Sequence, residues 1–269
     1  MGASCFNHWK RQFFRLYFPP VSEKISRFDG KASIYASSRP TYPVQTLRQI
    51  LEVTGLPPDA IVYDLGAGTG LFSKVLLEHF HQVHLVEPNA EMRSEAAMAL
   101  PPHRITTRDA SAEAFSEEPH SIDLITTAQS FHWFDRTKAK THWQQILKPE
   151  GWVAVIWNTR LLSSPFAQEV GSLLQSLVEN SPQHDIPQEL ADEEVLSFFQ
   201  SAQVLTAAHA TPLTEQELCN LVLSRSYSPL PSDRIFPKVI EQARDIHARY
   251  QSEGFVDMPY QTKLFIGRI

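Results

Sequence analysis

The chain has 269 residues, of which 42% are hydrophobic and 20% are charged, so it can bury a core and is not disordered throughout. Its formal net charge of -6 argues against a general nucleic-acid binder, and its 2 cysteines cannot build a disulfide scaffold. Its 11 histidines are scattered, which argues against a metal site. No apolar run reaches the roughly 18 residues of a membrane-spanning helix and no secretory signal is evident, so we expect a soluble, cytoplasmic protein without stable membrane insertion.

The first 31 residues differ in charge from the rest of the chain. They carry six lysines and arginines against two acids, and the stretch 8–20 mixes these cations with aromatic residues. Such a segment is typical either of an interfacial helix that touches a membrane or a partner, or of a packing arm ahead of the folded domain. We treat residues 1–25 as a basic-aromatic N-terminal extension.

Strands and helices alternate between about residue 59 and residue 157. Short apolar runs indicate strands here, and apolar residues at helical spacing indicate helices. In chain order we expect a strand at 60–65, a helix at 71–80, a strand at 82–87, a helix at 90–100, strands at 103–107 and 121–127, a helix at 136–147, a turn at 148–151 and a strand at 152–157. This alternation predicts a Rossmann-like, doubly wound α/β fold with a mostly parallel sheet.

After residue 158 the pattern becomes mainly helical. We expect two helices within 165–200 joined by a loop at 181–187, a strand at 202–209, a helix at 214–223, a helix at 232–251 that Pro237 could break, and a strand at 256–269. These patterns divide the chain into the extension, a core at 26–160, a helical lid at 161–251 that contributes one strand to the core, and a C-terminal strand at 252–269 that completes the sheet.

Glycine is scarce in this sequence except at one turn. Three of the 10 glycines, Gly66, Gly68 and Gly70, lie within five residues, directly after the strand that ends near Asp64. Glu87 ends the next predicted strand, 17 residues beyond Gly70. A carboxylate at this place can accept hydrogen bonds from both hydroxyls of a ribose. A glycine turn and a terminal acid at this spacing indicate an adenosine-containing cofactor at the carboxyl ends of the strands.

The glycine pattern is GxGxG, which is neither the dinucleotide GxGxxG nor a P-loop. Residues 62–70 (VYDLGAGTG) resemble motif I of the class I S-adenosylmethionine-dependent methyltransferases. Further segments resemble later motifs of this family: VEPNAEM (86–92), RDASAEAF (108–115), SIDLITTAQSFHWFD (121–135) and LKPEGWVAVIW (147–157), the last with Glu150 in place of a glycine. The resemblance implies a seven-stranded sheet with an added helical lid, and S-adenosylmethionine as cofactor.

Two segments narrow the resemblance to small-molecule enzymes of the trans-aconitate and ubiquinone-methylase type. They are residues 31–51, which we expect Pro40 and Pro43 to hold extended, and residues 128–135. By the same resemblance Tyr35 and Arg39 would close over the cofactor, Asp64 would lie near the methionine amino group, and Glu87 would hold the ribose. The full set of expected cofactor-binding residues is Tyr35, Arg39, Asp64, Gly66, Ala67, Gly68, Glu87, Pro88, Asp109 and Ala110, the last two on the adenine side.

The expected acceptor site follows the fourth and fifth strands. The resemblance implies a pocket lined by Gln129, Trp133, Phe134, Trp157 and Asn158. His132 is the candidate general base for a hydroxyl acceptor, although a packed histidine is the commoner role, and a carboxylate acceptor would need no base. Arg160, Arg225, Ser226 and Tyr227 of the lid could recognise an acid or be solvated.

We therefore expect a methyltransferase that acts by in-line displacement on a small molecule, with a carboxylate or a hydroxyl as the receiving group. The alternatives are a non-catalytic S-adenosylmethionine-binding partner module, a nicotinamide-dependent oxidoreductase, and an enzyme that methylates protein or nucleic acid. The sequence does not identify the acceptor, the oligomeric state or the role of the N-terminal extension.

Overall fold

A computed structural model describes residues 40–179, 190–225 and 227–269. The expectations for the extension 1–25, for Tyr35 and Arg39, for the loop 181–187 and for Ser226 lie outside these residues. None of the described helices is long and apolar enough to cross a membrane.

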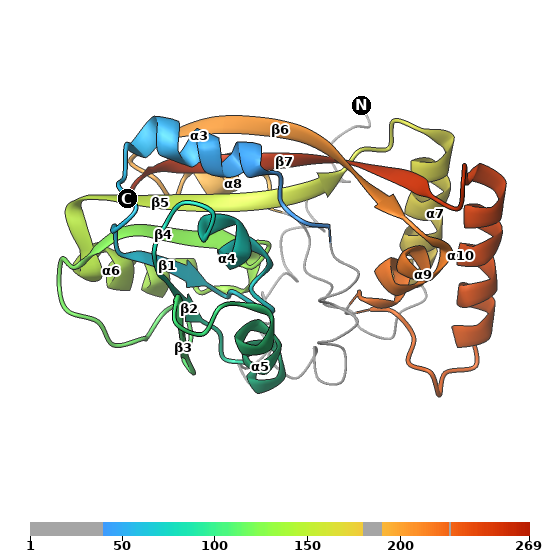
Figure 1. The fold of residues 1–269 in the computed structure, drawn as a ribbon, viewed down its shortest axis with the longest axis horizontal. Coiled ribbons are helices and arrows are strands. Elements are labelled where there is room, and N and C mark those ends of the chain that lie inside the picture. The colour runs from blue at the N-terminus through green and yellow to red at the C-terminus, as the bar shows by residue number, and fades with distance from the viewer. Residues whose placement is uncertain (1–39, 180–189, 226) are drawn as a thin grey trace, which may run out of the picture.

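The fold is built on one seven-stranded sheet, in the order β3-β2-β1-β4-β5-β7-β6 (Figure 1). Strands β1 to β5 are parallel, and β7 runs antiparallel to its neighbours β5 and β6. This confirms the Rossmann-like, mostly parallel α/β fold. The strands are β1 Val62–Leu65, β2 Val83–Val86, β3 Ile105–Arg108, β4 Ile122–Ala128, β5 Leu147–Arg160, β6 Ser201–Leu213 and β7 Val256–Arg268.

Helices cover both faces of the sheet. Apolar residues of α3, α4 and α5 form one cluster with the sheet, and those of α6 and α8 form another on the opposite face. The helices are α3 Val44–Thr54, α4 Leu71–Leu76, α5 Ala90–Ala99, α6 Arg136–Ile146, α7 Pro165–Glu179, α8 Asp192–Leu196, α9 Glu215–Leu223 and α10 Phe236–Tyr250, with a 3-10 turn η1 at Phe131–Trp133. Both faces are therefore covered, as in doubly wound folds.

Helix α3 corrects the expectation of an extended segment through residue 51. The chain is extended at Pro43, with φ -68° and ψ 141°, but helical from Val44 onward. Pro43 sits at the N-cap, where its missing N–H costs nothing and its carbonyl accepts the first bond, from Thr46 N at 2.9 Å. Burial of Leu47 and Ile50 against the sheet then stabilises the helix. The prolines set where the helix begins, and they do not prevent it.

Two smaller expectations also change. Pro237 does not break the last helix but lies at its start, where proline is tolerated, so α10 begins at Phe236 instead of near residue 232. The predicted turn at 148–151 lies within β5: Ile122 of β4 pairs with Leu147 and Leu124 pairs with Trp152, so the four residues between are an irregularity in the ladder.

The long strands join the sheet to a second group of helices. Helices α7, α9 and α10 share an apolar cluster with the first half of β7, which includes Val256, Met258 and Tyr260. The second half of β7, with Leu264 and Phe265, packs in the core of the sheet. Figure 1 shows β6 and β7 running from the sheet into this helical group, which we call the lid.

Candidate active site

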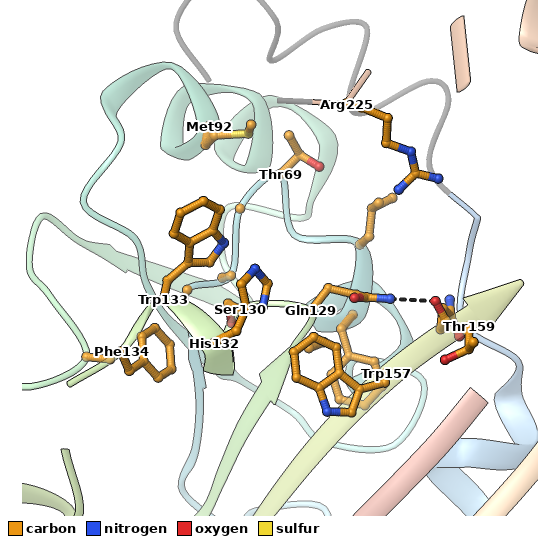
Figure 2. Close-up of a pocket in the computed structure, with 18 of the residues that line it drawn as sticks. Thr69, Met92, Gln129, Ser130, His132, Trp133, Phe134, Trp157, Thr159 and Arg225 are labelled. Carbon is orange, nitrogen blue, oxygen red and sulfur yellow. Dashed lines mark hydrogen bonds between the residues drawn. The ribbon is translucent and has the colours of Figure 1, made fainter. Parts of the chain in front are cut away.

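A cavity of about 1670 Å³ lies at the carboxyl ends of the parallel strands, between the sheet and the lid. Its lining includes these residues expected from the sequence: Asp64, Gly66, Ala67, Gly68, Glu87, Pro88, Gln129, His132, Trp133, Phe134, Trp157 and Asn158. Figure 2 shows how the side chains after β4 and on β5 gather around this space. The folded chain thus brings together residues that are almost 100 positions apart in sequence.

The glycines of the turn after β1 serve different purposes. Gly66 and Gly68 both have positive φ, +64° and +57°, which favours glycine. A Cβ added at Gly66 would lie 2.7 Å from Ser130 Cβ, whereas one added at Gly68 would meet nothing within 4 Å. Gly66 is therefore needed for internal packing, and Gly68 borders the open space of the cavity.

Asp64 is fully buried at the end of β1. Its Oδ2 accepts a hydrogen bond from Ser73 Oγ at 2.6 Å, and its Oδ1 accepts one from Thr126 Oγ1 at 2.9 Å. Burial raises its pKa to about 6, because removal from water disfavours the charged form more than these two bonds and its other hydrogen bonds favour it. Asp64 is therefore an acid whose charge a cationic ligand group would stabilise.

Glu87, at the end of β2, is fixed by the backbone around it. Its Oε2 accepts a hydrogen bond from Gly68 N at 2.9 Å, and its Oε1 accepts one from Asn89 N at 2.9 Å. Burial raises its pKa, opposed by these two N–H donors and by Arg93. A carboxylate can accept about four hydrogen bonds, so Glu87 keeps acceptor capacity toward the cavity it lines.

On the side expected to hold adenine, the structure differs from expectation. Asp109 and Ala110 are not among the residues that line the cavity, whereas Ser111 and Ala112 are. The Asp109 side chain is 71% exposed and forms an ion pair with Arg93 at 2.8 Å. Asp109 and Ala110 come directly after β3, which ends at Arg108, and the lining residues follow them in the next loop.

Aromatic rings form a further part of the cavity wall. The ring centroid of His132 lies 4.9 Å from that of Trp133 and 5.3 Å from that of Trp157. Figure 2 shows His132 between Trp133 and Trp157, with Phe134 below Trp133. Phe134 is 8% exposed and packs edge-on against Phe131, so it belongs to the core as much as to the cavity. His132 is therefore held by packing.

Gln129 and Asn158 belong to one hydrogen-bond network. Gln129 has a positive φ of 58°, which is uncommon outside glycine and clusters at functional sites. Its Nε2 donates to the backbone oxygen of Asn158 at 2.7 Å (Figure 2). The Asn158 side chain donates to Thr41 O at 3.3 Å and accepts from Thr262 Oγ1 at 2.5 Å. Asn158 thus lines the cavity while its amide is engaged by the protein.

Helix α7 forms the lid side of the cavity. Its apolar residues, among them Val170 and Leu174, face the lid core. Its other face lines the cavity with residues Gln168, Gly171, Ser172, Gln175, Ser176 and Glu179, spaced three and four apart. Arg160, Arg225 and Tyr227 also line this side. Arg225 extends toward the site in Figure 2.

Several lining residues were not expected from the sequence. Met92 of α5, Thr69 and Ser130 are among them, together with the α7 face. Ser130 Oγ donates to Leu65 O at 2.9 Å, and the buried Thr69 Oγ1 has no hydrogen-bond partner within the ranges that the structure describes. Of these unexpected residues, only those of α7 had a signal in the sequence, because the amphipathic spacing of that helix indicates a polar face. Among the described residues, no three His, Cys, Asp or Glu side chains are placed to hold a metal ion.

The comparisons with known proteins agree with this geometry. Residues 63–155 match the sequence profile of the methyltransferase domain family. The chain is 27% identical over 246 residues to a protein of Schizosaccharomyces pombe described as an uncharacterized methyltransferase-like protein, covering 90% of this chain and 94% of that one. It is 28% identical over 238 residues to a methyltransferase of Mycobacterium bovis, also described as uncharacterized, covering 87% and 92%.

Solved structures agree on the fold. A putative type II methyltransferase from Anaeromyxobacter dehalogenans superposes with a TM-score of 0.61 at 20% identity, covering 86% of this chain and 97% of that one. A Haemonchus contortus phosphoethanolamine N-methyltransferase, solved with phosphomonomethylethanolamine and S-adenosylhomocysteine, superposes with a TM-score of 0.53 at 15% identity, covering 94% and 60%.

Proposed function

Because the chain is a class I S-adenosylmethionine-dependent methyltransferase, we propose that it methylates a small molecule held between the sheet and the lid. The observation that carries this proposal is the cavity itself. One end is formed by the glycine turn and Glu87, and the other by α7 and the strand end at Arg160. A site covered by a helix on the acceptor side suits a small acceptor better than a folded protein or a nucleic-acid duplex.

The residues at the sheet end suit the methyl donor. Gly68 leaves open space where backbone must approach a ligand, and Glu87 keeps acceptor capacity for the ribose hydroxyls. Asp64 is a buried acid that a ligand ammonium group would keep ionised. When bound, S-adenosylmethionine supplies a methyl group on a positively charged sulfur, which is already a good leaving group.

The protein's main task is then to orient the acceptor and to exclude water. The rings of Trp133, His132 and Trp157 form a rigid wall, and Gln129 is fixed by its bond to Asn158. A carboxylate acceptor needs no base. For a hydroxyl acceptor, His132 would take the proton.

Roles for the remaining expected residues are part of the proposal. Tyr35 and Arg39, outside the described residues, would close over the donor. On the adenine side we favour Ser111 and Ala112 over Asp109 and Ala110, because only the former pair lines the cavity. Pro88 and Ala67 would contact the donor through their position on the same wall.

The test is transfer of label from methyl-tritiated S-adenosylmethionine. The full chain is incubated with a protein-free metabolite extract and, in parallel, with protein and with nucleic acid from the same cells. We expect label in the small-molecule fraction, lost in the Glu87→Ala variant. Label found only in precipitated protein or nucleic acid would contradict the proposed acceptor class.

A further inference from the structure

Arg160 occupies the point where the sheet passes into the lid. It is the last residue of β5 and pairs with Tyr260 of β7, and the next residue, Leu161, donates its N–H to Pro259 O at 2.9 Å. Because backbone bonds fix both positions, Arg160 is held on a rigid element. Its side chain lines the cavity on the lid side.

Every other arginine of the described ranges has an interaction within the protein or is exposed, although one nitrogen each of Arg225 (Nε) and Arg268 (Nη1) is enclosed without an acceptor. Ion pairs engage Arg93, Arg108, Arg136, Arg244, Arg249 and Arg268. Arg104 donates to three backbone carbonyls, and Arg48 and Arg234 are exposed. Arg225 also has an interaction within the protein. Arg160 differs from all of these.

Arg160 is half-buried, and neither a hydrogen bond nor an ion pair engages its side chain within the described part of the chain. Its Nη1 is enclosed and lacks an acceptor. An enclosed charged donor without an acceptor is costly, and a guanidinium group is best satisfied by a planar oxyanion that accepts two parallel hydrogen bonds. Nε and Nη2 of the same side chain also have no partner among the described residues but are not enclosed, so an oxyanion in the cavity can accept hydrogen bonds from these two nitrogens.

The described part of the surrounding wall gives that charge no ion-pair partner. The described face of α7 that lines the cavity presents glutamine, glycine and serine, and its one acid, Glu179, is exposed and accepts a hydrogen bond from Gln175 Nε2 at 3.2 Å. A second cation, Arg225, also lines the cavity and points toward the site in Figure 2. The lid side of the cavity is therefore polar and positive, unlike the acidic chain as a whole.

We propose that Arg160 binds an oxyanion group of the methyl acceptor, so that the substrates are small organic anions. The inference rests on the proposed function and adds the substrate class and a residue that selects it. Arg160 acts as a specificity-determining residue through a charge-assisted, bidentate contact. An acceptor without a negative charge would leave Arg160 buried and unpaired, and would be discriminated against for that reason.

The test begins with the wild-type chain, methyl-tritiated S-adenosylmethionine and a metabolite extract separated on an anion-exchange column. We expect the labelled acceptors to come from the retained, anionic fraction. Parallel reactions with carboxylate and phosphate subfractions identify which oxyanion is used. Acceptors found only in the unretained, neutral and cationic fraction would overturn the inference. Absence of label in every fraction, with S-adenosylhomocysteine still bound, would instead show that the proposed function has failed, and the inference with it.

Variants then test Arg160 itself with an acceptor purified from the active fraction. We expect Arg160→Gln to lower kcat/KM by about 10- to 100-fold, the usual effect of losing a hydrogen bond between charged groups, and Arg160→Lys to recover part of it. The matched control is Arg234→Gln, an exposed lid arginine away from the cavity, which should leave kcat/KM unchanged.

Binding of S-adenosylhomocysteine separates the two possible partners of Arg160. If Arg160 serves the acceptor, Arg160→Gln leaves the dissociation constant of S-adenosylhomocysteine unchanged. A weaker affinity in Arg160→Gln would show that Arg160 holds the donor's own carboxylate, and would overturn the inference. If Arg160→Gln does not fold, the wild-type fractionation and the Arg160→Lys variant still test whether Arg160 binds the acceptor.

Discussion

The two ends of the cavity differ in how their charged groups are satisfied. At the sheet end, Asp64 is held by two hydroxyl groups and Glu87 by two backbone N–H groups. At the lid end, Arg160 lines the cavity with no acceptor from the described protein. The carboxylates of the sheet end thus have partners within the protein, whereas the proposed partner of Arg160 at the lid end is the acceptor itself. This difference suits a common donor and an acceptor that must be selected.

The two ends are nevertheless joined by continuous strands. β7 packs in the lid core through Met258 and in the sheet core through Phe265. The lid is therefore an extension of the sheet, and its position over the cavity depends on the pairing of β5, β6 and β7. Variants that weaken one end while leaving the other intact test whether donor and acceptor functions separate along this line.

The largest effect is expected at the glycine turn. Gly68→Val places a side chain in the open space of the proposed donor site and strains a positive φ, so we expect S-adenosylhomocysteine affinity to fall by about 1000-fold, or about 4 kcal/mol. Isothermal titration calorimetry measures it. Gly55→Val is the matched control, because Gly55 has a φ of +64° and equally open surroundings but does not line the cavity. Equal loss in both variants would contradict a donor site at Gly68.

The next effect concerns the lid core. Leu174 is 2% exposed, and Leu174→Ala should lower the free energy of unfolding by about 3 to 4 kcal/mol by leaving a cavity in the lid. Chemical denaturation measures this change. We expect the donor affinity to stay within about twofold of wild type, because the lid core does not touch the glycine turn. Ile235→Ala, at a site that is 47% exposed, is the control and should change stability little. A parallel loss of donor affinity would show that the two ends are one unit.

The third prediction uses the pKa of Asp64. Burial raises the pKa of Asp64 from 3.8 to about 6 in the folded state. The folded wild type therefore becomes less stable as pH rises from about 4 to about 6, because Asp64 ionises in the unfolded chain before it does in the folded one. Asp64→Asn removes this loss of stability. The stability of the variant relative to wild type should therefore increase by about 3 kcal/mol between pH 4 and pH 7, while its affinity for S-adenosylmethionine falls. Urea denaturation at several pH values checks the trend. A difference that is independent of pH would contradict the assigned environment.

The smallest effect is expected at the start of α9. Thr214 and Glu217 form a capping box, with Glu217 Oε2 accepting from Thr214 N at 2.8 Å. Thr214→Ala should lower the free energy of unfolding by about 1 kcal/mol and leave donor affinity unchanged. Thermal unfolding with and without S-adenosylhomocysteine measures both quantities. If the ligand-induced shift in Tm disappeared in this variant, the proposed separation would be wrong.

The sheet end could be predicted from the sequence because its determinants are local. The glycines, Asp64 and Glu87 lie at the ends of adjacent short strands, and a parallel sheet brings such ends together. The fold class followed from the same alternation. The boundary errors arose where one residue type has two roles: Pro43 starts α3, and Pro237 lies in the first turn of α10, although proline also breaks helices.

The lid end could not be predicted in the same way, because it depends on contacts between distant segments. The Asn158 side chain is hydrogen-bonded to Thr41 and Thr262. These bonds depend on the pairing of β5 with β7 and on the path of the chain before α3. That Arg160 has no partner among the described residues depends on the position of every acceptor around it. That Ser111 and not Asp109 lines the cavity likewise depends on where β3 ends in space.

The most direct test of a donor site at the glycine turn and Glu87 is a titration of S-adenosylhomocysteine into the full chain and its Glu87→Ala variant. Removal of the carboxylate leaves Gly68 N and Asn89 N without their acceptor and removes the proposed ribose contact. We predict saturable binding to the wild type and a loss of about 100-fold or more in the variant, as expected when a buried charged hydrogen-bond partner is removed. Equal affinities in the two proteins would contradict the account.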